Sequence, residues 1–532
     1  MQIIVPMAGV GKRFLQRGYN TPKPLIEVEG KPIIQHIVEM FPGENDFVFI
    51  CNREHLQTTN MEKLLKSIKP SCKIVAVETG AGPVPNVLEA ESLISDGPVV
   101  VNYCDFSVKW NYEDFKRKMR ESGCDGCVTA YKGFHPHLLG PNLYAYMRWD
   151  EKTMRILEIQ EKGCFTDNKM NEYASTGAYY FKSGALLKKY FKLALDRGLQ
   201  KNGEFYVSLV YQPMIQDGLN NIIYEVEKFL QWGTPEDFEE YLYWSNAFRA
   251  KTHKQEVFDQ TIFDNLQIVL PMAGEGKRFR DEGYTAIKPL ITVSGKPMFV
   301  QAINDLPLAK KTIFLCRREH IEKYGIDKEV KKYFPQSEII VIEKLTEGQA
   351  CTCLLAESAL DPEKPLLIST VDAGGVWNFN SFCDLFFDEK ADAAIWTFRN
   401  NVTVERNPQA WGWVSVKADG LTVEKISCKV PVSNNPIRDH AIIGSFYFRK
   451  AKFFLDAAKR MIAADKRINN EFYVDIVLNE FPEMGLTARV FEVDKYLGWG
   501  TPNDLRVYEY WQDYFDWSSG HPYKKKIDED FQ

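Results

Sequence analysis

Short apolar runs alternate with amphipathic segments along the chain, and this alternation predicts its secondary structure. Four runs in the first half are rich in β-branched or aromatic residues and predict buried strands, at 3–5, 47–51, 73–77 and 99–102. Residues 32–41 and 86–94 carry apolar positions three to four apart, which is the period of an amphipathic helix. Strands and helices that alternate at this spacing predict a mostly parallel sheet with helices on both faces.

The whole pattern occurs twice. Residues 2–32 and 267–297 are identical at 20 of 31 positions. Further pairs of similar segments follow at an offset that drifts only from 265 to 267: 51–55 with 316–320, 101–105 with 369–372, 177–182 with 444–449, 202–207 with 469–474, and 232–235 with 499–502. Repeats of this length indicate two complete tandem domains rather than a solenoid of small units.

The charge pattern sets the predicted boundaries of these domains. We expect a first domain at 1–248, a polar linker at 249–264, a second domain at 265–516, and a charged, loosely held C-terminal tail at 517–532. The duplication also leaves open an intramolecular pseudo-dimer of the two domains.

Bulk composition narrows the class of protein. The chain has 532 residues, 45% of them hydrophobic, and a formal net charge of −6, which argues against a nucleic-acid partner. Its 11 cysteines are an odd number spread over both halves, as expected of reduced thiols in the cytoplasm. Because there is no signal-like N-terminus and no apolar run near 18 residues, we expect neither export nor a membrane span.

A glycine-rich turn follows the first predicted strand of each copy. In the first copy, Gly9 and Gly11 let backbone amides approach an anion, Lys12 and Arg13 add positive charge, and Lys23 is held between two prolines. The same parts recur in the second copy as Gly274, Gly276, Lys277, Arg278 and Lys288, except that Ile287 replaces the first proline and Lys288 is flanked by one proline only. The turn is neither a Walker A loop nor a dinucleotide fingerprint, and it predicts a site for the phosphates of a nucleotide.

The pattern G-x-G-x-R-F, followed by P-K-P, resembles the signature of the sugar-phosphate nucleotidyltransferases, which include nucleoside-diphosphate-sugar pyrophosphorylases and choline-phosphate cytidylyltransferases. The resemblance covers nearly all of each half. It implies two tandem α/β domains with a Rossmann-like nucleotidyltransferase fold. It also implies transfer of a nucleotidyl group from an NTP to a sugar phosphate or similar phosphorylated alcohol, with Mg²⁺ and release of pyrophosphate, as in the synthesis of surface-polysaccharide precursors.

The resemblance assigns roles on the donor side of each site. It implies catalytic cations at Arg13, Lys23, Arg278 and Lys288, and a metal ligand at Asp105 and Asp372. It places nucleotide contacts at Ala8, Gly9, Gly11 and Lys12, and at Ala273, Gly274, Gly276 and Lys277. Gln349 resembles a base-reading amide, whereas the first copy has no amide in this loop before Asn86.

The acceptor side departs from the family pattern. Glu161 and Lys162 match its Glu-Lys pair, but the second copy reads Cys428-Lys429, so the carboxylate for a sugar hydroxyl is expected to be lost there. A second metal-binding Asp is replaced by Gln231 and by Gly498. Glu204 and Glu471 are candidates for that ligand and for contact with the acceptor.

Three alternatives remain open from the sequence. One domain can be catalytic while the other only binds nucleotide or supports it. A related glycosyltransferase would need an Asp-x-Asp, which the segments around Asp105 and Asp372 do not supply. A nucleotide-sensing module is the third alternative, and the missing second aspartate is its best support.

Overall fold

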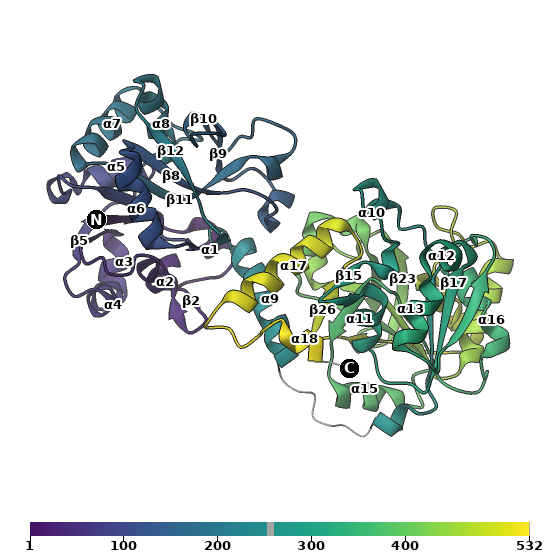
Figure 1. Cartoon of the computed structure of the whole chain (residues 1–532). Helices are drawn as coiled ribbons and strands as arrows, with labels where there is room; N and C mark the ends of the chain where they lie inside the picture. The colour runs from purple at the N-terminus through teal and green to yellow at the C-terminus, as the bar shows by residue number, and fades with distance from the viewer. Residues whose placement is uncertain (253–259, 531–532) are drawn as a thin grey trace. The chain divides into compact units, whose positions relative to one another are not determined.

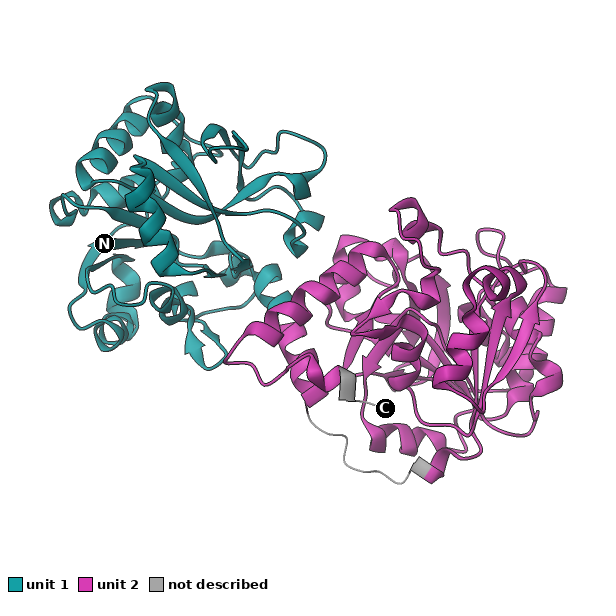
Figure 2. Ribbon diagram, in the orientation of Figure 1, with its two compact units in different colours: residues 1–241 teal, residues 242–532 magenta. Residues whose placement is uncertain are grey.

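The computed structural model describes residues 1–252 and 260–530 (Figure 1). The chain divides into two compact units, Met1–Tyr241 and Leu242–Gln532 (Figure 2). Each unit contains a nine-stranded mixed sheet of the same topology, so the fold is α/β in two tandem copies. No helix in the described ranges is long and apolar enough to cross a lipid bilayer.

In unit 1, the sheet is built around its first strand. Strands β5, β4, β1 and β6 lie in that order and run parallel, and β11 then pairs with β6 in the antiparallel sense. The four predicted strands are confirmed as β1 (Gln2–Met7), β4 (Phe47–Asn52), β5 (Lys73–Val77) and β6 (Val99–Asn102). The other sheet strands are β8 (Gly126–Tyr131), β9 (Ala145–Trp149), β10 (Ile156–Glu161), β11 (Tyr173–Phe181) and β12 (Asn221–Glu225).

This strand order has a functional consequence. The connections from β1 lead to β4 on one side, and the chain later returns to place β6 on the other side, so the order reverses at β1. In open α/β sheets, ligands bind beyond the carboxyl ends of the strands at such a reversal. The glycine turn after β1 and Asp105 after β6 both lie at this edge.

Helices cover both faces of the sheet in unit 1. Ile4 on β1 belongs to a core formed with α5, α7 and α8, while Ile3 and Val5 alternate to the opposite face and are also fully buried. The helices are α1 (Lys12–Gln16), α2 (Ile33–Glu39), α3 (Arg53–Thr58), α4 (Met61–Ile68), α5 (Pro83–Leu88), α6 (Tyr112–Ser122), α7 (Gly184–Asp196) and α8 (Val207–Gln216). Two ribbons complete the unit, β2 (Glu27–Val28) with β3 (Lys31–Pro32) and β7 (Phe106–Lys109) with β13 (Lys228–Gln231).

One predicted helix is displaced in the structure. The apolar period at 86–94 predicted a single helix, but α5 begins at Pro83, ends at Leu88, and is followed by a 3₁₀ turn at Glu91–Leu93. Pro83 is the first helical residue and Pro85 lies in the first turn, where an amide hydrogen is not needed by the helix. The prolines therefore set the start of α5 ahead of the apolar pattern.

Unit 2 repeats the sheet strand for strand. Its strands are β14 (Gln267–Met272), β17 (Lys311–Arg317), β18 (Glu338–Ile342), β19 (Leu366–Ile368), β21 (Ala393–Phe398), β22 (Gly412–Val416), β23 (Val423–Cys428), β24 (His440–Phe448) and β25 (Ala488–Glu492). Its ribbons are β15 (Thr292–Val293) with β16 (Lys296–Pro297) and β20 (Ala373–Val376) with β26 (Lys495–Gly498). Its helices are α10 (Lys277–Asp281), α11 (Met298–Asn304), α12 (Arg318–Tyr324), α13 (Ile326–Tyr333), α14 (Gln349–Leu354), α15 (Phe379–Phe386), α16 (Ala451–Ala463), α17 (Pro502–Trp517) and α18 (Lys526–Asp530).

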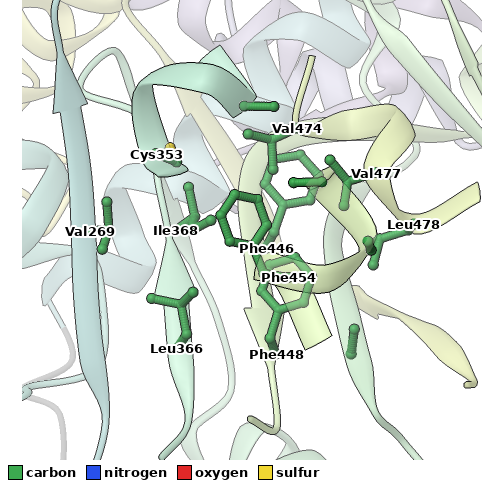
Figure 3. Packing of buried hydrophobic residues seen from close by; sticks show 14 of the residues in the cluster. Val269, Cys353, Leu366, Ile368, Phe446, Phe448, Phe454, Val474, Val477 and Leu478 are labelled. Carbon is green, nitrogen blue, oxygen red and sulfur yellow. The ribbon is translucent and has the colours of Figure 1, made fainter. Parts of the chain in front are cut away.

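A cluster of aromatic and aliphatic side chains forms one core of unit 2 (Figure 3). Ile368 on β19 and Phe446 on β24 face Cys353 on α14 and Phe454 on α16. The remaining wall is a 3₁₀ helix, η11 (Asp475–Glu480), in the place that α8 takes in unit 1. The element at this place is therefore an α-helix in unit 1 and a 3₁₀ helix in unit 2, and its first residues border the candidate site.

The predicted linker and tail are folded wherever the structure describes them. Helix α9 (Pro235–Thr252) includes residues 249–252, and Phe263 is fully buried, while residues 253–259 lie outside the described residues. In the predicted tail, His521 and Tyr523 are buried. Tyr523 packs on Phe248 with ring centroids 4.7 Å apart, so an aromatic side chain of the charged tail reaches a core.

Candidate active site

The glycine turn opens onto empty space in unit 1. Gly11 has φ 66° and ψ 40°, a left-handed conformation that favours glycine, and it precedes α1. A Cβ on Gly9 or Gly11 would meet no atom within 4 Å. Lys12 and Arg13 are exposed and make no side-chain ion pair or hydrogen bond within the described parts of the chain. The turn therefore presents backbone amides and two free cations to an anion.

Lys23 and Asp105 form an ion pair beside this turn. Lys23 Nζ lies 2.7 Å from Asp105 Oδ2 and 3.1 Å from the carbonyl oxygen of Gly233. The two side chains are 18% and 28% exposed, so the pair is partly shielded from water. Burial opposes the charge on Lys23, but the Asp105 carboxylate more than offsets it and raises the lysine pKa above its usual value. Lys23 is therefore a fixed cation at the carboxyl edge of the sheet.

Unit 2 contains the same pair with one additional contact. Lys288 Nζ donates to Asp372 Oδ2, and Thr370 Oγ1 donates to Asp372 Oδ1. Burial raises the pKa of Asp372, but Lys288 and Thr370 outweigh it and lower the pKa below its usual value. Both oxygens of Asp372 are thus engaged within the chain. Tyr103 stands at the equivalent position in unit 1, and Asp105 Oδ1 accepts no hydrogen bond in the described structure.

A cavity of about 640 Å³ collects the predicted residues of unit 1. Its lining includes all ten of them: Ala8, Gly9, Gly11, Lys12, Arg13, Lys23, Asp105, Glu161, Lys162 and Glu204. These residues come from four separate stretches of the sequence, and the fold brings them to one edge of the sheet. The volume lies within the range of small-molecule sites in proteins, about 300–1,000 Å³.

Asp237 is a carboxylate of this site that the sequence analysis missed. It accepts from the amide and hydroxyl of Thr234 at 3.2 and 2.8 Å, and from Gln231 Nε2 at 2.5 Å, and so completes a capping box with Thr234 at the start of α9. Burial raises its pKa to about 6. A Cβ on Gly233 would lie 3.6 Å from Asp105 Oδ2 and 3.9 Å from Asp237 Oδ2, so the two acids face the same point.

The spacing Thr-Pro-Glu-Asp could have identified Asp237 as a helix cap, but not as a neighbour of Asp105. Unit 2 repeats the arrangement: Thr501 is the N-cap of α17, its hydroxyl donates to Asp504 Oδ2 at 2.8 Å, and burial raises the pKa of Asp504. Gly498 leaves room there for the Tyr496 ring, which fills the space of a side chain at that position.

The acceptor end of the cavity is built from the ends of β10 and of the loop before α8. Glu161 is buried and accepts from Ser208 Oγ at 2.5 Å. Burial raises the pKa of Glu161 above its usual value, although Ser208 and Lys162 act against it. Lys162 has φ 53°, and its Nζ contacts the Tyr206 hydroxyl at 2.5 Å, while Tyr206 donates to Glu204. Sequence reasoning missed Tyr206 and Ser208.

The corresponding lysine of unit 2 keeps the same backbone conformation. Lys429 has φ 64°, and its Nζ lies 5.9 Å from the centre of the Tyr473 ring. Cys428 precedes it and is buried, and Glu471 stands two residues before Tyr473. The lysine, the aromatic ring and the glutamate of this corner are therefore present in both units.

The second loop differs between the units. Asn86 lines the cavity of unit 1 and is 8% exposed, and its Oδ1 packs against Gly80. Asn52 Nδ2 ties this loop to the glycine turn by donating to Ala8 O at 3.2 Å and to Thr79 Oγ1 at 2.9 Å. In unit 2, Gln349 is the first residue of α14 and makes no side-chain hydrogen bond among the residues described. Each unit therefore has an amide in this loop, but at different positions.

The donor set of unit 1 is chemically suited to Mg²⁺. This ion usually takes one or two carboxylates from the protein and completes its shell with water and substrate phosphates. Asp105 offers a carboxylate with one uncommitted oxygen beside Asp237. Within the described ranges, no group of three or more His, Cys, Asp or Glu side chains is arranged to hold a metal by itself. A nucleotide would have to supply the remaining ligands.

Comparison with known proteins agrees with this geometry. The family model described as nucleotidyl transferase matches residues 3–241 and 267–528, so the chain belongs to the nucleotidyl transferase family and contains it twice. The chain is 27% identical over 219 residues to the bifunctional protein GlmU of Methanocaldococcus jannaschii, covering 41% of this chain and 47% of that protein.

Two further relatives are similar to parts of the chain. It is 28% identical over 189 residues to the mannose-1-phosphate guanylyltransferase catalytic subunit beta of Dictyostelium discoideum, covering 34% of this chain and 49% of that protein. The chain thus spans about half the length of the curated relatives it matches. Among solved structures, the nucleoside-diphosphate-sugar pyrophosphorylase of Vibrio cholerae matches with a TM-score of 0.38 and 20% identity, over 46% of this chain and 99% of that one.

Proposed function

We propose that the chain is a tandem nucleotidyltransferase that transfers a nucleotidyl group from an NTP to a sugar phosphate or similar phosphorylated alcohol and releases pyrophosphate. One observation carries this proposal. A glycine turn with two free cations, the Lys23–Asp105 pair and the Glu161–Lys162 corner all line one cavity in unit 1. A donor triphosphate and a phosphorylated acceptor can therefore meet there.

In this proposal, the donor side binds and orients the triphosphate. The amides of the glycine turn, with Lys12 and Arg13, hold the β- and γ-phosphates that leave as pyrophosphate. Lys23 lies where charge accumulates on the α-phosphate. Asp105 would hold Mg²⁺, which neutralises phosphate charge and fixes the geometry of the triphosphate when bound.

The acceptor side supplies the attacking group. An oxygen of the acceptor phosphate forms a bond to the α-phosphorus, and the bond from that phosphorus to the bridging oxygen of pyrophosphate breaks. Lys162 would orient the acceptor phosphate and Glu161 a sugar hydroxyl, so the reaction needs no covalent intermediate with the protein. The names of the relatives, among them mannose-1-phosphate guanylyltransferase and glucose-1-phosphate cytidylyltransferase, support hexose 1-phosphates as acceptors.

We further propose that the products are precursors for surface polysaccharides, made in the cytoplasm with Mg²⁺. The second candidate arrangement has unit 1 as the catalytic unit and unit 2 as a nucleotide-binding partner. It is favoured by Asp372, both of whose oxygens are already engaged by Lys288 and Thr370.

The test is a matrix of four NTPs against hexose 1-phosphates and phosphocholine, with pyrophosphate release as the readout. We expect at least one pair to react and chelation by EDTA to abolish the reaction. Asp105→Asn and Asp372→Asn are then compared on that pair and on the rest of the panel. Activity that survives each single variant on a different acceptor supports two active units, whereas complete loss in Asp105→Asn alone supports the second arrangement. Absence of pyrophosphate release with every pair would refute the proposed function.

A further inference from the structure

Three equivalent positions on the acceptor wall differ together between the units. In the strand alignment at an offset of 267, they are Ala145, Glu161 and Ser208 in unit 1, and Gly412, Cys428 and Asp475 in unit 2. Each set contains one carboxylate, but it stands on β10 in unit 1 and at the start of η11 in unit 2.

In unit 1, the carboxylate reaches the cavity from the sheet. Glu161 pairs with Ala145 across β9 and β10, so the two side chains share one face, and both line the cavity. Ser208 lies behind them and donates its hydroxyl proton to Glu161 at 2.5 Å. A small residue at 208 leaves room for the longer glutamate.

In unit 2, the carboxylate reaches the same face from the opposite element. Cys428 pairs with Gly412 across β22 and β23, as Glu161 pairs with Ala145. A Cβ on Gly412 would lie 2.6 Å from Asp475 Oδ2, so the carboxylate occupies the place of the Ala145 methyl group. The glycine and the small thiol thus create the space that Asp475 fills.

No other residue that the structure describes is a partner of the Asp475 carboxylate. The carboxylate makes no side-chain hydrogen bond or ion pair with any residue in the described part of the chain. Burial raises its pKa to about 6, although a hydrogen bond from its own backbone amide acts against this. Asp475 is only partly buried, whereas Glu161 is buried and is paired with Ser208.

We infer that Asp475 is the acceptor-binding carboxylate of unit 2, and that it accepts a hydrogen bond from a hydroxyl of a phosphorylated sugar distinct from the acceptor of unit 1. On this inference, the carboxylate that Cys428 removes from β23 is supplied by the facing element η11. The inference rests on the proposed function and gives unit 2 a substrate class of its own.

The surrounding wall indicates how the second acceptor differs. Ser175 lines the cavity of unit 1, and the equivalent residue of unit 2 is Ile442. Ile442 packs against Gly412 beside the carboxylate. One hydroxyl group is thus replaced by an aliphatic side chain, which favours an acceptor with fewer hydroxyls, such as a 6-deoxyhexose 1-phosphate, over a fully hydroxylated hexose 1-phosphate.

The test measures binding separately from turnover. Isothermal titration calorimetry of the full-length chain in a Glu161→Ala background uses hexose 1-phosphates, 6-deoxyhexose 1-phosphates, phosphocholine and inorganic phosphate as probes. We expect unit 2 to bind a hydroxyl-bearing sugar phosphate more tightly than inorganic phosphate. Asp475→Asn should weaken that binding about tenfold to a hundredfold, the range for a hydrogen bond to a charged group.

A triple variant that places the unit 1 residues in unit 2 distinguishes ligand binding by Asp475 from a purely structural role. The triple variant Gly412→Ala, Cys428→Glu, Asp475→Ser rebuilds the unit 1 wall in unit 2 and should regain binding with the probe preference of unit 1. Thermal unfolding confirms that each variant is folded. The inference is wrong if Asp475→Asn binds like its parent, if the folded triple variant does not regain binding, or if no sugar phosphate binds better than inorganic phosphate or phosphocholine. Binding without pyrophosphate release would instead refute the proposed function alone.

Discussion

Replacing Lys23 with methionine tests the proposed chemistry of unit 1 most directly. The substitution keeps the length of the side chain and removes the cation that lies 2.7 Å from Asp105. Because the neighbouring carboxylate raises the lysine pKa above its usual value, Lys23 is protonated throughout the neutral range, and its loss is felt at any assay pH near 7. Asp105 is left without a cation to balance its charge.

Two magnitudes follow from this geometry. Loss of a cation aimed at the transition state should lower kcat about 10²- to 10³-fold, as for other preorganised electrostatic groups. The pair is only 18% and 28% exposed, so the orphaned carboxylate should also cost about 1–3 kcal/mol of unfolding free energy. Because the folded pKa of Lys23 is raised, the ion pair contributes its full stabilisation at pH values below the unfolded pKa of 10.5. This stabilisation is lost only as the pH rises through the higher folded pKa.

The assay is pyrophosphate release under saturating substrates, together with urea unfolding. Lys31→Met is the matched control, because Lys31 pairs with Glu39 at 2.8 Å on an exposed surface where both side chains are over 40% exposed. That control should keep its kcat and change stability by less than about 1 kcal/mol. If Lys23→Met is folded and keeps more than about a tenth of the parental kcat, the catalytic role assigned to Lys23 is wrong.

Two further predictions concern base recognition and stability. Asn86→Ala should change the ranking of the four NTPs in unit 1, and Gln349→Ala should do so in unit 2, as judged by kcat/KM; an unchanged ranking would place base recognition elsewhere. In unit 2, burial raises the pKa of Asp305 to about 7 from 3.8, although Lys251 acts against it, so the folded state loses stability as the pH rises between these values. Asp305→Asn should remove that penalty and raise the unfolding free energy above pH 7 by about 1–4 kcal/mol, with a flatter pH profile; equal stability of variant and parent at pH 8 would contradict it.

Much of the fold follows from local patterns in the sequence. The strands at 47–51 and 99–102 are buried along their whole length because both faces of the parallel sheet are covered, and their apolar runs can be recognised from the sequence alone. The helix at α5 is different, since its start is set by Pro83 rather than by the apolar period. The linker and tail were misleading because their aromatic residues, such as Phe263 and Tyr523, are buried by distant parts of unit 2.

Residues of the site could be predicted only where one short segment of the sequence contains all the groups that act together. The glycine turn and the aspartate after β6 are such segments, because strand order alone brings them to one edge. Asp237 was not predicted as a site residue because its sequence context is that of a helix start. Its position near Asp105 depends on the pairing of β13 with β7, which the sequence does not show. Asp475 was not predicted because its proposed role depends on Gly412 and Cys428, which lie more than forty positions earlier on two strands and share no local motif with it.

The acceptor wall shows why a substitution cannot be interpreted from its own position. Cys428 alone suggests a unit that has lost its hydroxyl-binding acid, and the non-catalytic alternatives would then gain support. Gly412 changes that interpretation, since a methyl group there would meet Asp475 Oδ2 at 2.6 Å and exclude the carboxylate from this face. Degeneration of an unused site would fill or scatter the space, whereas these three residues together keep one acid at one place. A donor side shared by both units and, on our inference, an acceptor acid relocated in one of them are the arrangement expected of one chemistry applied to two substrates.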